Sequence, residues 1–434
     1  MKQVLNLTDE QKHIIKTQYM LLCKDKLLER EYKNDDFSPR NNYQRDYARI
    51  LYSPSFRRLQ GKMQIVGVNA SAFYRNRLTH SLEVAQIATS IAKMLSDTVG
   101  EMYSFEDIYV IEAAALAHDI GHPAFGHKGE RVLNEIAKAH GLHFEGNAQN
   151  YRVLRHLEKK EHGHCGLNLT NRTLLAINKY IVKEDAAVEK FIFAEDYDRL
   201  MEFRKANNIP NERTLDVQII ELADDIAYAV HDLEDALSLN LCSVDDILFE
   251  LGEKDNEAQS LFQNIIQEAQ KNVKRTKDVE NIQENSHLFR KTLTSILTNT
   301  FVHKLKVSTL SNEQCREYGV PEGTKELSLD ENHKQLCKLL SKIIFNCAIK
   351  NSNIALYEAK GEIVIKTLFN IYSNELSNQK FNLLPPDYRP KEKASKIEIA
   401  QNVINYIAGM MDTCAILEHE KLTGKSFSTI DLST

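Results

Sequence analysis

Histidines and acidic residues gather in the stretch AAALAHDIGHPAFGHKGE, which spans Ala113–Glu130. It places His118 next to Asp119, and an apolar helical pattern leads into this pair before Gly121 and Pro123 end it. Neighbours in the middle of a helix point about 100° apart, whereas at a frayed helix end both side chains can reach one metal ion. A neutral imidazole nitrogen and a hard carboxylate oxygen suit Mn²⁺, Fe²⁺ or Mg²⁺ better than a structural zinc.

Two more ligand candidates lie elsewhere in the chain. His80 stands at the start of an amphipathic segment, on the same stripe as Ile91. Taken alone, it fits a buried, hydrogen-bonded core histidine. Asp224 lies in ELADDIAYAVHDLEDAL, where Tyr228 and Asp232 follow at i+4 and i+8 on one helix face. Taken alone, this pattern fits a solvated acidic helix face.

A basic segment precedes most of these residues. From Arg40 to Arg77 the chain has eight basic residues against one acid, Asp46. The segment is either a solvated charged surface or a patch that receives phosphate groups. The formal net charge of the whole chain is −6, which excludes a general binder of polyanions.

Helical periodicity dominates the chain, and no strand-spaced series with hairpin turns is visible, so we predict an all-α fold. Amphipathic stripes predict helices near residues 82–95, 108–118, 215–237, 258–270, 333–347 and 397–417. A short hairpin could hide near residues 65–73 or 362–365. We expect an N-terminal helical arm (1–40), a catalytic core (41–250) and a C-terminal helical region (251–434) that completes the site and makes oligomer contacts.

The composition is ordinary for a soluble globular protein, since 42% of the 434 residues are hydrophobic and 27% are charged. No apolar stretch is long enough to cross a bilayer, and the N-terminus lacks an apolar signal core. We therefore expect a cytoplasmic protein with no membrane partner. The seven cysteines are scattered without a CxxC pair, which favours free thiols over disulfides or structural zinc.

Taken together, these residues resemble the HD-domain phosphohydrolases, in which an H…HD…D pattern holds one or two divalent metals. Within that group the chain looks most like the deoxyguanosinetriphosphate triphosphohydrolases. The resemblance rests on YQRDYARILYSPSFRRLQGKMQIVGV, NRLTHSLEVAQIA, HDIGHPAFGHKGE, FEGNAQNYRVL, LADDIAYAVHDLEDAL and YIAGMMD, in this order. It runs from about residue 36 to near the end of the chain and implies an HD-domain helical core with an additional C-terminal helical region.

The resemblance implies a divalent metal held by His80, His118, Asp119 and Asp224. Mg²⁺ and Mn²⁺ are the expected metals, with Fe²⁺ and Co²⁺ as further candidates. Asp224 is preferred to Asp225 because the family's aspartate is followed four and eight positions later by Tyr and Asp.

Catalytic and substrate-binding residues follow from the same resemblance. His127 and Glu130, one helical turn apart, match the family's catalytic histidine and its acidic partner, and His122 matches a histidine that contacts phosphate. Tyr228 is expected to pack on the deoxyribose, where a 2′-hydroxyl would collide. The expected substrate contacts are Gln64, Arg77, Tyr228, Asp232, Lys179 and Tyr180. The chain departs from the family's pattern at Ile181, where the family has proline, and at Cys414, where it often has tyrosine.

The activity implied by the resemblance is hydrolysis of a deoxynucleoside triphosphate, dGTP above all, to a deoxynucleoside and tripolyphosphate. The resemblance also implies a dimer-based homo-oligomer, with a hexamer as one form, and allosteric control by a dNTP or single-stranded DNA. Two alternatives stay open: an HD phosphohydrolase acting on another nucleotide, and a non-catalytic HD protein that senses nucleotides or single-stranded DNA. The presence of His127 and Glu130 beside four intact ligands argues against the second.

Overall fold

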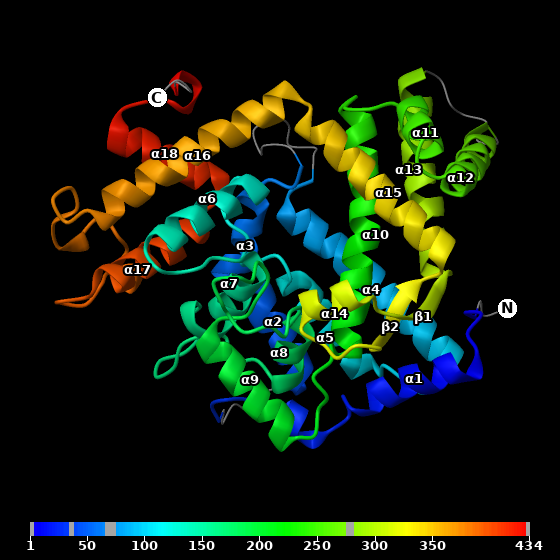
Figure 1. The fold of residues 1–434 in the computed structure, drawn as a ribbon, viewed down its shortest axis with the longest axis horizontal. Helices are drawn as coiled ribbons and strands as arrows, with labels where there is room; N and C mark the ends of the chain where they lie inside the picture. The colour runs from blue at the N-terminus through cyan, green and yellow to red at the C-terminus, as the bar shows by residue number, and fades with distance from the viewer. Residues whose placement is uncertain (1–3, 34–38, 66–74, 275–281, 431–434) are drawn as a thin grey trace.

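The computed structural model describes residues 4–33, 39–65, 75–274 and 282–430, which form eighteen α-helices, six short 3-10 or π turns and one two-stranded sheet (Figure 1). The predicted all-α fold is confirmed, with a small antiparallel hairpin added to it.

The helices of the first half of the chain are α1 (Asp9–Met20), α2 (Asn42–Leu51), α3 (Pro54–Arg58), α4 (Arg77–Val99), α5 (Phe105–Ala117), α6 (Gly126–Ala139), α7 (Gly146–Arg152), α8 (Asn171–Ile177), α9 (Ala194–Ala206) and α10 (Leu215–Ser238). Those that follow are α11 (Val244–Gly252), α12 (Asn256–Lys274), α13 (Ile282–Val302), α14 (Asn312–Tyr318), α15 (Glu331–Ile349), α16 (Ser352–Ser373), α17 (Lys396–Ala408) and α18 (Asp412–Thr423). Strands β1 (Leu305–Thr309) and β2 (Lys325–Leu329) pair antiparallel, with Leu305 opposite Leu329.

Three long helices, α4, α5 and α10, pack against one another at the centre of the molecule. The helix α4 begins at Asn76, whose side chain accepts a hydrogen bond from the backbone N–H of Thr79 at 3.1 Å. Its predicted stripe is fully buried, as Val84, Ile91 and Leu95 show. The packing of these apolar stripes holds three separate stretches of sequence in fixed register, because side chains in such a core cannot slide without opening voids.

The C-terminal helices form a second apolar core together with α6. The helix α6 packs against α16, which also contacts α17 and α18 (Figure 1). This second core contains Phe125, Leu133, Val364 and Ile407. A Cβ atom at Gly361 would lie 2.4 Å from the Phe125 ring, so α16 approaches this closely only because it has glycine there. The segment that carries His122 and His127 is therefore supported from the C-terminal part of the chain.

The structure differs from the sequence prediction in its hairpin and in its last helices. Residues 362–365 lie inside α16, so that hairpin prediction was wrong, and residues 66–73 of the other fall outside the described residues. The hairpin found is β1–β2, whose strands have five residues each. The predicted helix 397–417 is two helices, α17 and α18, separated at residues 409–411.

The structure also bears on the cysteines and on the apolar character of the long helices. All seven cysteines are free thiols, as predicted. In the described part of the chain, no helix has the length and apolar character that a bilayer span requires.

Candidate active site

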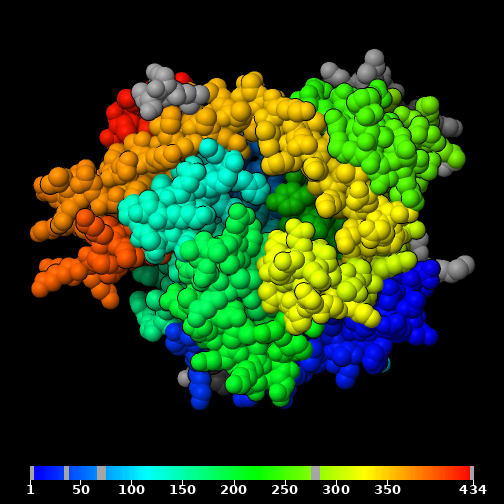
Figure 2. Space-filling view, in the orientation of Figure 1, coloured from blue at the N-terminus to red at the C-terminus, as the bar shows by residue number. Residues whose placement is uncertain are grey.

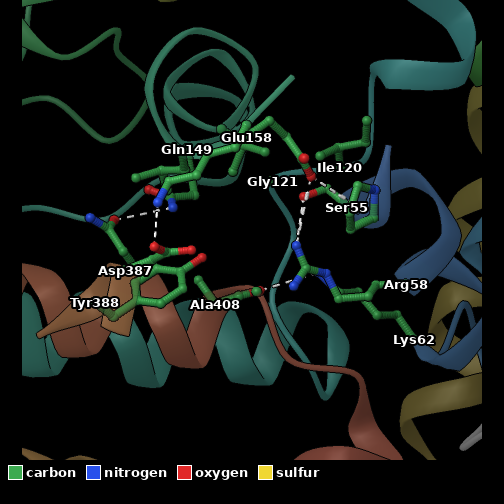
Figure 3. Close-up of a pocket in the computed structure, with 16 residues that line it drawn as sticks. Ser55, Arg58, Lys62, Ile120, Gly121, Gln149, Glu158, Asp387, Tyr388 and Ala408 are labelled. Atoms are coloured by element: carbon green, nitrogen blue, oxygen red, sulfur yellow. Dashed lines mark hydrogen bonds and ion pairs between the residues drawn. The ribbon is translucent and has the colours of Figure 1, made fainter. Parts of the chain in front are cut away.

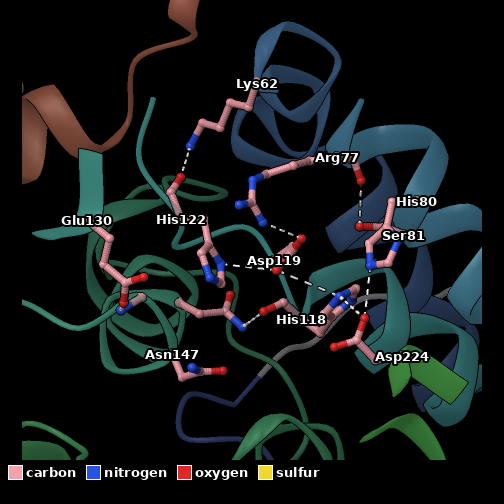
Figure 4. A network of polar contacts seen from close by, with 12 residues as sticks. Lys62, Arg77, His80, Ser81, His118, Asp119, His122, Glu130, Asn147 and Asp224 are labelled. Carbon is pink, nitrogen blue, oxygen red and sulfur yellow. Dashed lines mark hydrogen bonds and ion pairs between the residues drawn. The ribbon is translucent and has the colours of Figure 1, made fainter. Parts of the chain in front are cut away.

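The predicted metal ligands come together from α4, α5 and α10 (Figure 4). His80 lies in the first turn of α4, His118 caps the C-terminus of α5 with Asp119 beside it, and Asp224 lies in the middle of α10. Asp224 Oδ1 is 2.9 Å from His80 Nε2 and 3.6 Å from His118 Nε2. His118 Nε2 is 3.7 Å from Asp119 Oδ1. Because α5 ends at Ala117, the neighbours His118 and Asp119 both reach the cluster.

These four side chains fit a divalent metal. Ligand atoms of His80, His118 and Asp119 all lie within 4.8 Å of one another. Ligand atoms that bind one metal ion at about 2.1 Å lie about 3.0–3.5 Å from one another, close to the distances between the ligand atoms of this cluster. His118 Nδ1 lies 2.6 Å from the carbonyl oxygen of Ala115, whereas its buried Nε2 has no hydrogen-bond partner among the described residues. A proton on Nδ1 leaves the Nε2 lone pair available to a metal.

The charged side chains of the cluster compensate one another. Burial lowers the pKa of His118, but the carboxylates of Asp119 and Asp224 outweigh burial and raise it to about 9. Burial raises the pKa of Asp119, but Arg77 and the neighbouring histidines hold it well below its usual range. The pKa of Asp224 is lowered in the same way by His118 and His80, against burial. Two carboxylates stay ionised in a buried place, which is the electrostatic setting that a cation requires.

Arg77 and His122 contact Asp119 from outside the cluster. Arg77 is 2% exposed, and its Nη1 donates to Asp119 Oδ2 at 2.6 Å. His122 Nδ1 lies 3.0 Å from Asp119 Oδ1. Arg77 is buried against Asp119, where it orients that carboxylate, and its predicted substrate contact stays a prediction.

The loop between α5 and α6 is anchored to distant parts of the chain. Lys62 Nζ donates to the carbonyl oxygen of His122 and to that of Ala408, the latter at 3.2 Å. Phe125 has a φ of 63°, in the left-handed region, and its N–H donates to Asp412 Oδ1 at 3.1 Å. These bonds hold the loop in a conformation that a non-glycine residue rarely adopts by itself.

His127 and Glu130 occupy the first turns of α6, as predicted. His127 exposes 61% of its side chain, and its Nδ1 lies 3.7 Å from Glu130 Oε2, within ion-pair range but longer than a good hydrogen bond. Glu130 accepts a hydrogen bond from the N–H of Gly146 at 2.9 Å. Burial raises the pKa of Glu130, but His127, His122 and Lys190 hold it well below its usual range. An ionised carboxylate therefore stands beside an exposed imidazole.

An open cleft lies in front of these residues, with α10 at its floor (Figure 2). One part of it, here called the apolar chamber, has a volume of about 280 Å³ and contains the predicted residues Gln64, His127, Tyr228 and Asp232. The apolar residues that line it are Met63, Ile65, Ile344, Phe345, Ala348, Ile349 and Ile354. The Tyr228 ring lies 4.9 Å from that of His80, which joins the chamber to the metal cluster.

The second part of the cleft, here called the charged chamber, has a volume of about 400 Å³. It contains the predicted residues Lys179 and Tyr180, and Lys179 Nζ forms an ion pair with Glu221. Asp225 and Ser341 line both chambers, so the two form one continuous cleft. The structure thus brings five of the six predicted substrate contacts to the cleft walls, and Arg77 alone lies behind the cluster.

Several cleft residues had no signal in the sequence analysis. Phe345 on α15 and Glu358 on α16 line the apolar chamber. Asp412 is fully buried and accepts bonds from the N–H groups of Met63 and Phe125. The motif YIAGMMD could have pointed to Asp412, whereas an amphipathic pattern predicts the α15 helix but not what its polar face borders.

Comparison with known proteins agrees with this site. The HD domain matches residues 77–229, which contain the four clustered residues, and a phosphohydrolase-associated domain matches residues 327–421. The helical core and its His–Asp cluster make the protein an HD-domain phosphohydrolase, a group whose members bind divalent metals.

Relatives extend the similarity over nearly the whole chain. It is 40% identical to deoxyguanosinetriphosphate triphosphohydrolase-like protein 2 of Vibrio cholerae, over 98% of this chain and 97% of the relative. It is 33% identical to the deoxyguanosinetriphosphate triphosphohydrolase-like protein of Shewanella sediminis, over 93% and 96%. The chain therefore belongs to the deoxyguanosinetriphosphate triphosphohydrolase-like family, and the predicted resemblance is confirmed.

Proposed function

We propose that the protein hydrolyses a deoxynucleoside triphosphate, preferably dGTP, to the deoxynucleoside and tripolyphosphate. The observation that carries this proposal is the adjacency of three features: the buried His–Asp cluster, the exposed His127 beside an ionised Glu130, and a cleft with one apolar and one charged chamber. The names of the relatives supply the substrate class.

The metal would be held by His80, His118, Asp119 and Asp224. When bound, such a cation lowers the pKa of a water molecule and polarises a phosphoryl oxygen. Arg77 donates a hydrogen bond to Asp119 Oδ2, which fixes the orientation of that carboxylate.

His127 is the group proposed to protonate the leaving group. Water adds to the α-phosphorus and gives up a proton to solvent, the bond from that phosphorus to the 5′-oxygen breaks, and the 5′-oxygen takes a proton. His127 is exposed to the apolar chamber and can donate this proton. Glu130 lies within ion-pair range of the imidazole, and His122, in the loop before α6, contacts Asp119.

The sugar is proposed to lie against Tyr228, with Asp232 and Gln64 as its polar contacts. Asp232 is 6% exposed, its Oδ1 has no hydrogen-bond partner among the described residues, and burial raises its pKa well above the usual range. Gln64 Oε1 is likewise buried without a described partner. Buried polar atoms of this kind are satisfied by a ligand that carries hydroxyl groups.

The base is proposed to occupy the apolar chamber, where Phe345 and Ile349 offer apolar surface and Glu358 offers a carboxylate. Among the DNA bases, guanine alone presents two adjacent N–H donors, at N1 and N2, to such an acceptor. The triphosphate would extend toward the charged chamber, where Lys179 and Tyr180 lie.

The test is turnover of the four dNTPs and GTP by the full-length chain, with Mg²⁺ and Mn²⁺ in separate reactions and products resolved by ion chromatography. We expect equal amounts of deoxynucleoside and tripolyphosphate, the highest kcat/KM for dGTP, and ¹⁸O from labelled water in the tripolyphosphate. Release of orthophosphate or pyrophosphate would instead indicate an HD phosphohydrolase of another specificity, and binding without turnover would indicate a sensor.

The predicted homo-oligomer and the predicted dNTP or single-stranded DNA effector are tested with the same preparation. Light scattering after size exclusion gives the mass in solution, and addition of each effector below substrate saturation gives its influence on kcat/KM.

A further inference from the structure

A separate cavity of about 190 Å³ lies beside Gly121, between the HD core and the C-terminal helices (Figure 3). Its lining includes Arg58 and Lys62 from the basic segment, Gln149 from α7, and Asn405 from α17. It shares no lining residue with either chamber of the cleft. The proposed reaction does not use it.

The positive charge in this cavity is not fully compensated by the protein. Its two carboxylates are already engaged: Glu158 accepts from the N–H of Ser55 at 2.8 Å and lies 3.7 Å from Arg58 Nη2, and Asp387 forms an ion pair with Lys159. Lys62 is 1% exposed, and within the described residues its Nζ donates to two carbonyl oxygens and forms no ion pair. Burial lowers the pKa of Lys62 to about 7, and a bound anion would favour the charged form of this side chain.

The opposite side of the cavity offers a hydrogen-bond acceptor. Figure 3 shows Gln149, Asp387 and Tyr388 on one side, with Arg58 and Lys62 on the other. Gln149 is 1% exposed, and its Nε2 donates to Asn405 Oδ1 at 3.2 Å, which fixes the orientation of the amide. Its Oε1 is buried and has no partner among the described residues. This oxygen needs a donor that the protein does not supply.

We propose that the cavity binds a small hydroxylated phosphomonoester. The phosphate would be held by Arg58 and Lys62, since a guanidinium fork and an ammonium together match a phosphate dianion. A hydroxyl group at the other end of the ligand would donate to Gln149 Oε1. The volume of about 190 Å³ is below the roughly 300 Å³ at which pockets for drug-sized ligands begin, so a nucleoside triphosphate is too large.

Lys62 connects this cavity to the loop of the candidate active site. Its Nζ donates to the carbonyl oxygen of His122 as well as to that of Ala408. A phosphate that binds the ammonium competes with the His122 carbonyl, so occupation of the cavity changes the anchoring of the loop. The proposal goes beyond the proposed function, and its binding test does not depend on which nucleotide is hydrolysed.

The experiment measures binding of ribose 5-phosphate and inorganic phosphate to the metal-loaded protein by isothermal titration calorimetry. We expect saturable binding of ribose 5-phosphate that persists in His118→Ala, a variant of the proposed metal site. Arg58→Met should weaken the binding of both probes by about tenfold or more, because one charge-assisted hydrogen bond is lost. Gln149→Leu should weaken ribose 5-phosphate but leave inorganic phosphate unchanged, which a general loss of structure could not do.

Three results would overturn the proposal: no saturable binding to the wild-type protein, binding that neither Arg58→Met nor Gln149→Leu weakens, or binding that disappears in His118→Ala. The last would place the probe at the metal cluster. Arg58 is the variant of choice should Gln149→Leu fail to fold, because its side chain is 35% exposed and its loss opens no cavity in the core.

Discussion

The His–Asp cluster and the cleft wall that faces it differ in the kind of side chain they present and in its exposure to solvent. In the cluster, Asp119 is buried and Asp224 exposes 13% of its side chain, and histidines and Arg77 compensate the two carboxylates at distances from 2.6 to 3.7 Å. On the cleft wall, Phe345 and Ile349 of α15 are more than half exposed, although they border the chamber that contains Tyr228 and Asp232.

This difference follows from what each side must do. A metal site needs donors held at fixed positions, because a shift of an ångström breaks coordination. A wall that receives a base must be open to solvent until the ligand covers it, so it keeps exposed apolar surface. The rigid side is built from α4, α5 and α10 and the open side from α15 and α16. Variants of the first should therefore abolish activity, and variants of the second should change selectivity.

The largest effect is expected from loss of a cluster residue. Replacing His118 with Ala, or Asp224 with Ala, removes a donor and leaves an uncompensated charge, so bound metal and activity should both fall to background. Elemental analysis of the dialysed protein together with dGTP turnover measures both. The matched control is His13→Ala, an exposed histidine on α1, which should keep full metal content. Full retention of metal in either cluster variant removes that residue from the proposed ligand set.

A smaller effect is expected where the two sides meet, at His127. Replacing His127 with Ala should lower kcat roughly 10²- to 10⁴-fold, the range for loss of a general acid, with metal content unchanged. Arg131→Ala, an exposed residue on the same helix, is the control. Loss of metal from the His127 variant would make it a ligand and would contradict the division of roles between the two sides.

The sequence predicts the rigid side far better than the open one. His118, Asp119 and Asp224 stand in motifs whose spacing is set by helix geometry, and the apolar stripes of α4 and α10 lie buried as predicted. The hydrogen bond from Arg77 to Asp119 follows from the packing of α4 against α5, which the sequence motif does not reveal.

The open side depends on contacts between distant segments, which no local pattern encodes. Phe345 and Glu358 line the same chamber as Gln64, although α15 and α16 lie nearly 300 residues beyond it in the chain. Asp412 bonds to Met63 and Phe125 in the same long-range way. The apolar stripe of the sequence predicts the α15 helix. The same periodic pattern results whether the residues opposite the stripe face solvent or a cleft.

Glu358 tests whether the open wall selects the base. Replacing Glu358 with Gln removes the charged acceptor for guanine N1–H and N2–H, and we expect kcat/KM for dGTP to fall roughly tenfold relative to the other dNTPs. Competition assays with paired dNTPs measure this ratio directly. Glu375→Gln, an exposed residue beyond α16, should leave it unchanged. An equal loss for all four dNTPs would mean that Glu358 supports the chamber without contacting the base.

The smallest effect concerns Lys62, a buried cation for which the described residues show no ion pair. Burial, together with Arg58 and Arg77 nearby, lowers the pKa of Lys62 to about 7. Below pH 7 both the folded and unfolded proteins hold this proton, and folding bears the full cost of burying the charge. Between pH 7 and about 10.4, the usual lysine pKa, only the unfolded chain keeps this proton, so the stability of the folded protein rises with pH.

The free energy of unfolding of the wild type minus that of Lys62→Met should therefore increase across this pH window, by at most about 1.4 kcal/mol per pH unit. Paired denaturant titrations measure this difference. A flat difference would mean that the ammonium stays charged in the folded protein through its bonds to the His122 and Ala408 carbonyl oxygens.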